Sequence, residues 1–215
     1  MVFYGSLIVL YCAASGVGKL TICDFDTVDL TNLQRQIIHT TQSVGINKAV
    51  SAQQTIYEIN PEIIVQTIQQ KSTEAEFKAL AANVDVVIDC SDNFATRYAL
   101  NRVCLQLKNP LVSGAAIGFE GQISVFDFRH ENSPCYHCLF PDTGSDQEMR
   151  CAENGVFAPL VGMIGTAQAA EALKLMMNIG ESLQGRLLLL DALAMEWRTI
   201  KLARDPACAV CRSDF

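Results

Sequence analysis

Two pairs of cysteines have the spacing of a metal-binding knuckle. Cys135 and Cys138 form one Cys-x-x-Cys motif, and Cys208 and Cys211 form the other near the end of the chain. Four thiolates can bind one tetrahedral zinc ion, and four protein ligands leave no open position for catalysis. The pairs therefore predict a structural Zn²⁺ that fastens the end of the chain to the domain. Redox-active pairs or buried bystanders are the alternatives.

A second group of reactive side chains lies in residues 24–36, which read DFDTVDLTNLQRQ. This mixture of carboxylates, amides and an arginine follows the short apolar run 20–23, which we interpret as a buried strand. Asp24 would then lie at the carboxyl end of a strand, where open α/β sheets bind ligands and an acidic side chain commonly holds a ribose hydroxyl. The segment predicts a nucleotide site.

Arg35, Lys48 and Asp92 carry the charges that a nucleoside triphosphate requires. Cations neutralise the phosphate oxygens, and a carboxylate holds Mg²⁺, which usually takes only one or two protein ligands. The alternative is a surface arginine, a lysine that starts a helix and an aspartate that caps the helix starting at Asn93. Spacing alone leaves both interpretations open, because any α/β domain has charged loops.

Cys151 differs from the other cysteines because it lies in a polar loop. It follows Arg150 and precedes a predicted helix, two features that lower a thiol pKa and favour a nucleophilic thiolate. The cysteines in apolar runs are instead interpreted as core residues; they are Cys12, Cys23, Cys90 and Cys104. Each histidine is expected to be hydrogen-bonded or solvent-facing; these are His39, His130 and His137.

The elements that must position these residues alternate between strands and helices. We expect helices over 7–14, 48–60, 73–82 and 93–107, and strands over 20–23, 63–68, 84–90, 110–113 and 122–128. Thr73 and Glu76 have the spacing of a capping box, and Gly118 and Gly121 indicate turns before the last of these strands. The alternation is typical of a doubly wound, mostly parallel α/β sheet.

The pattern changes after residue 134. The knuckle and a polar loop precede an apolar run over 156–177, and two strand-like runs follow over 186–190 and 196–202. Gln168, Glu171 and Lys174 interrupt the apolar run at helical spacing, which favours an amphipathic helix over a membrane span. We therefore expect one domain over 1–215, with a nucleotide-binding part (1–134) and a carboxyl-terminal part (135–215) that extends the sheet with antiparallel strands.

Composition excludes several classes of protein. The chain has 215 residues, of which half are hydrophobic, and this is enough for one substantial core. The formal charge of −7 argues against a nucleic-acid partner, and no polybasic run suggests a membrane surface. Nine cysteines, an odd number that includes two Cys-x-x-Cys pairs, favour a reducing, cytoplasmic location. No basic residue precedes Lys19, which argues against a signal peptide.

Several segments in the right order resemble the ThiF/MoeB/HesA family, the bacterial relatives of the ubiquitin-activating enzymes. The segments are 24–36, 45–48, 89–93, 111–116, 119–122, both knuckles and 151–155, and the resemblance runs from about Gly5 to Cys211. It implies ATP- and Mg²⁺-dependent adenylation of the carboxyl-terminal Gly-Gly of a ubiquitin-like sulfur carrier, for thiamine or molybdopterin biosynthesis. It also implies a separate sulfur donor protein and a homodimer.

The resemblance assigns roles by position. Asp24 would bind the ribose and Asp92 the magnesium. The phosphates would be bound by Asn32, Arg35 and Lys48, with Gln36 and Gly5 also in the nucleotide-binding set. Cys151 matches a cysteine that engages the activated carrier through sulfur in the thiamine branch. Small residues of the long helix, at Gly162, Gly165 and Ala169, would allow close packing in a dimer.

The beginning of the chain departs from the family pattern. Family members begin with a helix that carries an arginine, then a first strand and a glycine-rich turn, whose last glycine aligns with Gly5. We therefore expect the first strand and most of the turn to be missing. An inactive module that binds the carrier or dimerises is the alternative to an adenylyltransferase. A Rossmann oxidoreductase is a weaker third hypothesis, because the glycine fingerprint is absent.

Overall fold

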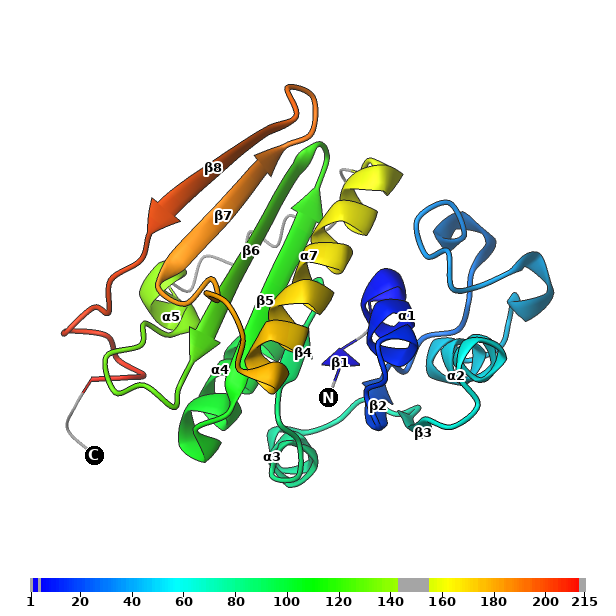
Figure 1. The fold of residues 1–215 in the computed structure, drawn as a ribbon, viewed down its shortest axis with the longest axis horizontal. Coiled ribbons are helices and arrows are strands. Elements are labelled where there is room, and N and C mark those ends of the chain that lie inside the picture. Colours follow the sequence, from blue (N-terminus) through cyan, green and yellow to red (C-terminus); the bar gives the residue numbers. More distant parts are fainter. Residues whose placement is uncertain (1, 4, 143–154, 213–215) are drawn as a thin grey trace.

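One eight-stranded sheet with helices on both faces organises the protein (Figure 1). The computed structural model describes residues 2–3, 5–142 and 155–212. The helices and strands are β1 Val2–Phe3, α1 Ser6–Ala14, β2 Lys19–Cys23, η1 Leu30–Asn32, η2 Thr41–Ser43, α2 Lys48–Ile59, β3 Ile64–Ile68, α3 Glu74–Ala81, β4 Val87–Asp89, α4 Phe94–Leu107, β5 Pro110–Ile117, β6 Glu120–Asp127, α5 Tyr136–Leu139, α7 Ala158–Met177, β7 Arg186–Asp191 and β8 Glu196–Lys201.

The sheet has a parallel half and an antiparallel half. Its strand order is β3-β2-β1-β4-β5-β6-β7-β8, and the pairs from β3 to β5 are parallel. The pairs from β5 to β8 are antiparallel. This arrangement confirms the predicted doubly wound sheet with a carboxyl-terminal antiparallel extension.

The first strand corrects one expectation. Instead of being absent, a two-residue strand β1 lies in the middle of the sheet. Val2 aligns with Ile22 on one side and Ile88 on the other, and Phe3 aligns with Cys23 and Asp89. These short pairings join β2 to β4, whose backbone groups at this edge would otherwise lack partners.

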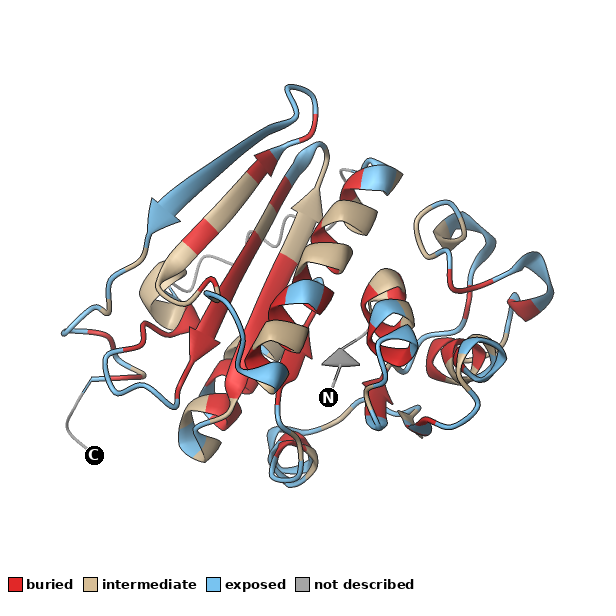
Figure 2. Cartoon of the chain, viewed as in Figure 1, coloured by how far each residue is buried: buried red, intermediate tan, exposed pale blue. Residues whose placement is uncertain are grey.

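The two faces of the sheet support separate hydrophobic cores. Ile88 and Val112 belong to the core under α1, α2 and α7, whereas their neighbours Val87 and Leu111 belong to the core under α3 and α4. This alternation is the two-residue period of a strand covered on both faces. Figure 2 shows the buried central strands and the exposed edge strand β8.

Local signals at the helix ends agree with the sequence in most cases. Thr73 and Glu76 form the predicted capping box of α3. Asn93, and not Asp92, caps α4, since its side chain accepts a hydrogen bond from the Thr96 N–H. Gly118 adopts a positive φ of 54° in a turn, as expected. Gly121 lies inside β6, so its assignment to a turn was wrong.

Helix α7 differs from the amphipathic helix that the sequence predicts. Gln168 and Glu171 are only 2% and 6% exposed, so these polar residues lie on the buried side of the helix. The Gln168 amide donates to the Asp89 carbonyl at 2.9 Å, and the Glu171 carboxylate accepts from the Leu183 N–H at 2.8 Å. Hydrogen bonds to backbone therefore replace apolar contacts at these two positions.

The small residues of α7 pack within the chain. A Cβ atom on Gly162 would lie 3.1 Å from Leu7 of α1, and one on Gly165 would lie 3.6 Å from it. Ala169 is 1% exposed. This stripe therefore lets α1 and α7 approach closely, instead of offering a surface for a second subunit. Among the described residues, no helix combines the length and apolarity needed to cross a bilayer.

We predict that Gly114→Ala destabilises the fold by about 1–3 kcal/mol, because overpacking forces buried groups to move. The new Cβ would lie 2.4 Å from the Gln168 side chain, whose hydrogen bond to Asp89 would be disturbed. Urea unfolding measures the change. Gly18→Ala is the matched control: Gly18 has no neighbour within 4 Å of an added Cβ, so an effect below about 1 kcal/mol is expected. Equal stabilities of the two variants would contradict the prediction.

Candidate nucleotide and metal sites

The strand order reverses between β1 and β4, at the edge where the parallel strands end. Gly5 follows β1 and precedes α1, and Cys90 follows β4. A Cβ atom on Gly5 would lie 2.9 Å from the Cys90 sulfur, so the two strand ends are in close contact there. Open α/β sheets bind ligands in the crevice at such a switch point. Asp24 follows the adjacent strand β2 and Asp92 follows β4, at the same edge.

Asn47 holds the segment after β2 against the start of α2. Its side-chain oxygen accepts hydrogen bonds from Ala49 and Val50, and its amide donates to the carbonyls of Asp24 and Asp26 at 3.0 and 3.1 Å. One side chain thus caps a helix and fixes the turn after a strand. As a result, the acidic segment and Lys48, the first residue of α2, lie side by side.

Lys48 is an unusual cation because it is buried, with only 7% of the residue exposed. Its ammonium group lies 3.0 Å from the carboxylate of Asp26, whose side chain is 54% exposed. The lysine therefore starts a helix, as the alternative to a phosphate-binding role predicted. Its charge also lies at the edge of the sheet where the parallel strands end, which we call the strand-end edge. Opposite charge and partial access to water make its burial tolerable.

The Asp24 carboxyl has an altered acidity. Desolvation by burial raises its pKa to about 6, against the lowering effects of the Lys48 charge and of the Asp26 N–H at 2.9 Å. The negative charges of Asp26 and Asp92 raise it further. Asp92 follows β4 and Asp24 follows β2, the two strands that flank β1, so both carboxylates lie at the same edge of the sheet.

Asn32 is the last residue of η1, which is capped by Asp29, and Arg35 and Gln36 follow this helix. The Arg35 guanidinium donates to the Thr31 carbonyl at 3.3 Å and, in the described part of the chain, forms no ion pair. Asn32 contacts the Thr31 hydroxyl at 3.5 Å. The side-chain oxygen of Gln36 is buried and has no hydrogen-bond partner among the described residues. The segment thus keeps polar groups unused by the fold.

Asp92 is exposed at the end of a rigid turn. The buried carboxylate of Asp89, 1% exposed, accepts hydrogen bonds from the backbone and hydroxyl of Ser91 at 2.9 and 2.7 Å. It also accepts one from the Ser113 hydroxyl at 3.1 Å. These contacts define the direction in which the chain leaves β4, and they therefore position the backbone of Asp92.

The four predicted metal ligands come together, although they are far apart in the sequence. Their Sγ atoms all lie within 4.8 Å of one another. The distances are 3.8 Å for Cys135 to Cys138, 3.7 Å for Cys135 to Cys208 and 3.4 Å for Cys138 to Cys211. Four sulfurs at about 2.3 Å from a tetrahedral zinc would lie about 3.8 Å apart, and a disulfide would need about 2.05 Å. The geometry fits a zinc ion.

His137 is a neighbour of this cluster that the sequence left without a partner. Its Nε2 accepts a hydrogen bond from the Asp142 N–H at 3.3 Å, and its Nδ1 lies 3.5 Å from the Cys208 sulfur. In the neutral ring, an acceptor at Nε2 leaves the proton on Nδ1, so His137 can donate to the Cys208 thiolate. Such contacts orient metal ligands.

The other cysteines and histidines have structural surroundings. Cys12, Cys23 and Cys104 are buried as expected, and desolvation raises the pKa of the Cys12 thiol to about 11. Cys90 is only half-buried. His39 is buried and contacts the Ser51 hydroxyl at 2.7 Å. His130 is exposed beside Asp127. Cys151 lies outside the described residues, so its proposed role stays a prediction.

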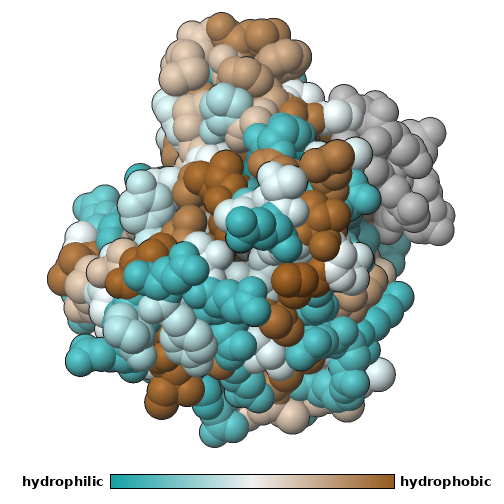
Figure 3. Space-filling model, turned by 90° about the vertical axis from the view of Figure 1, so that its right-hand side faces the viewer, coloured by the Kyte–Doolittle hydropathy of each residue, from teal (hydrophilic) through white to brown (hydrophobic). Residues whose placement is uncertain are grey.

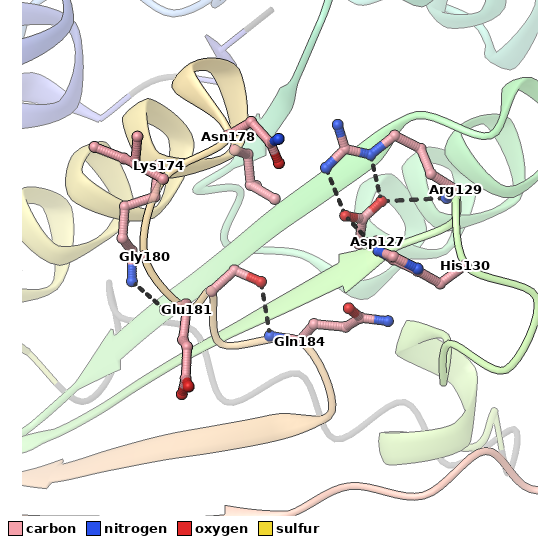
Figure 4. A pocket seen from close by; sticks show the side chains of 11 residues that line it. Asp127, Arg129, His130, Lys174, Asn178, Gly180, Glu181 and Gln184 are labelled. Carbon is pink, nitrogen blue, oxygen red and sulfur yellow. Dashed lines mark hydrogen bonds and ion pairs between the residues drawn. The ribbon is translucent and has the colours of Figure 1, made fainter.

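A pocket lies elsewhere on the molecule. It has a volume of about 320 Å³ and is formed by the end of β6, the end of α7 and residues 180–184 (Figure 4). Because β6 is antiparallel to β5, this is the opposite edge of the sheet. Arg129 pairs with Asp127 at 2.6 Å, and the Lys174 amine donates to the Glu181 carbonyl. These charged side chains of the pocket are therefore already paired within the protein.

Sequence reasoning missed several residues that organise the sites. Asp26, Asn47, Asp89 and Arg97 all bond to a predicted site residue or its neighbour. Asp26 and Asn47 lie inside the motifs already singled out, so their position gave a signal. Asp89 is the last residue of a strand that is otherwise apolar, and a carboxylate there is unusual. Arg97 had no local signal.

Comparison with known proteins identifies the family of the chain. The sequence matches the ThiF family over residues 4–210. The molybdopterin-synthase adenylyltransferase of Escherichia coli is 46% identical over 201 residues, which cover 94% of this chain and 80% of that protein. The sulfur carrier protein ThiS adenylyltransferase of E. coli is 42% identical over 207 residues, which cover 96% of this chain and 81% of that protein.

The fold also matches solved structures. The crystal structure of E. coli MccB superposes with a TM-score of 0.85 at 19% identity, over 100% of this chain and 65% of that one. At this identity the match supports the fold alone. The sequence match over residues 4–210, together with relatives above 40% identity, shows that the chain belongs to the ThiF family.

Proposed function

We propose that the protein is an ATP-dependent adenylyltransferase that activates the carboxyl-terminal glycine of a ubiquitin-like sulfur carrier. The observation that carries the proposal is the common edge of the sheet that holds the Asp24 carboxyl after β2, the buried Lys48 ammonium at the start of α2 and the exposed Asp92 after β4. Relatives with 46% and 42% identity are named as adenylyltransferases for molybdopterin synthase and for ThiS, respectively. The proposal is therefore the step that these two activities share.

In this reaction a carboxylate oxygen of the carrier attacks the α-phosphorus of ATP. A bond forms between these atoms, the bond from the α-phosphorus to the bridging oxygen breaks, and pyrophosphate leaves with its electron pair. The protein has little covalent chemistry to perform, so positioning and charge compensation supply the catalysis. Asp24 would accept hydrogen bonds from the ribose hydroxyls.

The charged groups would act on the phosphates. Lys48 and Arg35 would offset the negative charge of the phosphate oxygens, and Asn32 and Gln36 would donate hydrogen bonds. Asp92 would hold Mg²⁺, which when bound neutralises charge on the leaving pyrophosphate. The N–H groups at the start of α1, after Gly5, would form part of the phosphate cradle.

We also propose that the chain acts as a homodimer. Exposed large apolar side chains gather on segment 25–44 beside the site: Phe25, Leu30, Ile37 and Val44, from 43% to 65% exposed. Figure 3 views the molecule from the side of this segment, where hydrophobic residues lie exposed among hydrophilic ones. A separate sulfur donor protein and a carrier-linked role for Cys151 remain expectations from the family.

The test of the proposed function is exchange of radioactive pyrophosphate into ATP. Purified protein is assayed with a ThiS-type carrier, with the small subunit of molybdopterin synthase, and with each carrier lacking its last two glycines. Exchange that requires Gly-Gly supports adenylation, and the more effective carrier identifies the branch. A chain that binds a carrier without any exchange would instead support the alternative of an inactive binding module.

We predict that Asp92→Asn lowers the exchange rate by about 100-fold or more, because a metal that stabilises transition-state charge is worth several kcal/mol. Asp85→Asn is the matched control, since Asp85 is also exposed but precedes the other end of β4. Its rate should equal that of the wild type. An Asp92→Asn variant with wild-type rates at all Mg²⁺ concentrations would remove this residue from the site.

Zinc content provides a separate prediction. Elemental analysis of the purified wild type should give about one zinc per chain, and Cys208→Ser should lower it severely and destabilise the carboxyl-terminal residues. Cys12→Ala, in the core and outside the cluster, should keep the wild-type content. A folded wild type that is free of zinc and insensitive to chelators would refute the metal assignment.

The raised pKa of Asp24 predicts a pH-dependent gain in stability for Asp24→Asn. The pKa of Asp24 is about 6 in the folded protein, whereas the ordinary pKa of an aspartate is 3.8, so wild-type stability falls as pH rises between these values. The variant lacks this loss. It should therefore match the wild type only below about pH 3.8 and exceed it by up to about 3 kcal/mol above pH 6, while losing affinity for ATP. Unfolding at a series of pH values measures this, and a difference independent of pH would contradict it.

A further inference from the structure

The Arg97 side chain connects the two candidate sites. Arg97 lies in the first turns of α4, and its Nε and Nη2 atoms both donate to the Ser91 carbonyl, at 3.1 and 2.5 Å. Its Nη1 donates to the Tyr136 hydroxyl at 3.2 Å. The guanidinium also lies 5.9 Å from the centre of the Phe94 ring. A planar group with several fixed donors is suited to holding two partners in one geometry.

One of these partners, Tyr136, is fixed by the cysteine cluster. It lies between the ligands Cys135 and Cys138 in the sequence and is only 2% exposed. Its N–H donates to the Asn101 side chain at 2.8 Å, and its ring packs edge-on against Tyr98 at 5.8 Å. The position of its hydroxyl therefore depends on the knuckle around the four sulfurs.

The other partner belongs to the peptide group that precedes Asp92. The Ser91 carbonyl and the Asp92 nitrogen share one planar unit, so fixing the carbonyl fixes the backbone from which the Asp92 side chain starts. Asp89 holds the other side of Ser91 through its N–H and hydroxyl. Removal of Arg97 would leave the carbonyl side of this turn without its two charge-assisted hydrogen bonds.

We propose that Arg97 is a positioning residue for Asp92 and that it transmits the order of the cysteine cluster to the magnesium end of the nucleotide site. This inference rests on the proposed function for its catalytic consequence, but its structural consequence can be measured without activity. The hydrogen bonds of Arg97 reach Asp92 through the Ser91–Asp92 peptide and the cysteine cluster through Tyr136. The zinc knuckle then supports the catalytic geometry as well as the fold.

The experiment compares Arg97→Met with Arg102→Met, a control on the same helix whose side chain is 43% exposed and pairs with Glu74. Arg97→Met should raise the Mg²⁺ concentration for half-maximal pyrophosphate exchange by about tenfold, because it removes the charge-assisted hydrogen bonds to the Ser91 carbonyl. Tyr136→Phe, which removes only the hydroxyl, should raise it by about two- to fivefold. Arg102→Met should leave it unchanged, and zinc content should stay at the wild-type level in all three.

Hydrogen exchange of the ligand-free proteins separates this inference from the proposed function. Arg97→Met should speed exchange at the backbone amides of 90–94, and Arg102→Met should not. If the wild type fails to catalyse pyrophosphate exchange but these amides respond as expected, the proposed function fails and the positioning role stands. If Arg97→Met leaves both the Mg²⁺ dependence of an active enzyme and these amides unchanged, the inference is wrong. If Arg97→Met lowers the unfolding temperature without a local change in hydrogen exchange, the inference is also wrong, because that result indicates a purely structural role.

Discussion

A buried carboxylate at the end of β4 is the constraint on which the arrangement of the site depends. Asp89 is 1% exposed, and both of its oxygens accept hydrogen bonds, from Ser91 and from Ser113 of β5. Its backbone carbonyl accepts one from Gln168 of α7. A carboxylate in the interior is tolerated only when its oxygens are paired, so its partners must be correctly placed before the fold is stable. Strand, turn and helix are thereby fixed together.

The same logic accounts for the other half of the strand-end edge. Asn47 satisfies the first turn of α2 and two carbonyls after β2 with one amide group. Because Asn47 bonds to all of these groups at once, a shift of the acidic segment along the helix would leave several polar groups unpaired. Both sides of the crevice are therefore built on hydrogen-bonded turns, while the apolar contacts of the two cores hold the strands beneath them.

The sequence predicts the parts of this structure that local patterns encode. Strand and helix periods predicted the order of the elements, and the spacing of the cysteines predicted the cluster of four sulfurs, because a knuckle is a local motif. Prediction failed where tertiary hydrogen bonds decide. Gln168 and Glu171 indicated a polar helix face, but each is buried against a backbone partner that is distant in the sequence. The role of Arg97 could not be predicted for the same reason, since its partners lie on two other segments.

The charge of Asp24 at the strand-end edge lowers the free energy of unfolding. Burial raises the pKa of its carboxyl to about 6, so the charged form is held at a cost that Lys48 and one backbone N–H offset only in part. Donors supplied by a ligand, such as ribose hydroxyls, would relieve it, and the relief would appear as binding free energy. A carboxylate held at such a cost where the parallel strands end is better explained by a ligand than by stability, which favours a nucleotide site at this edge over a set of charged loop residues.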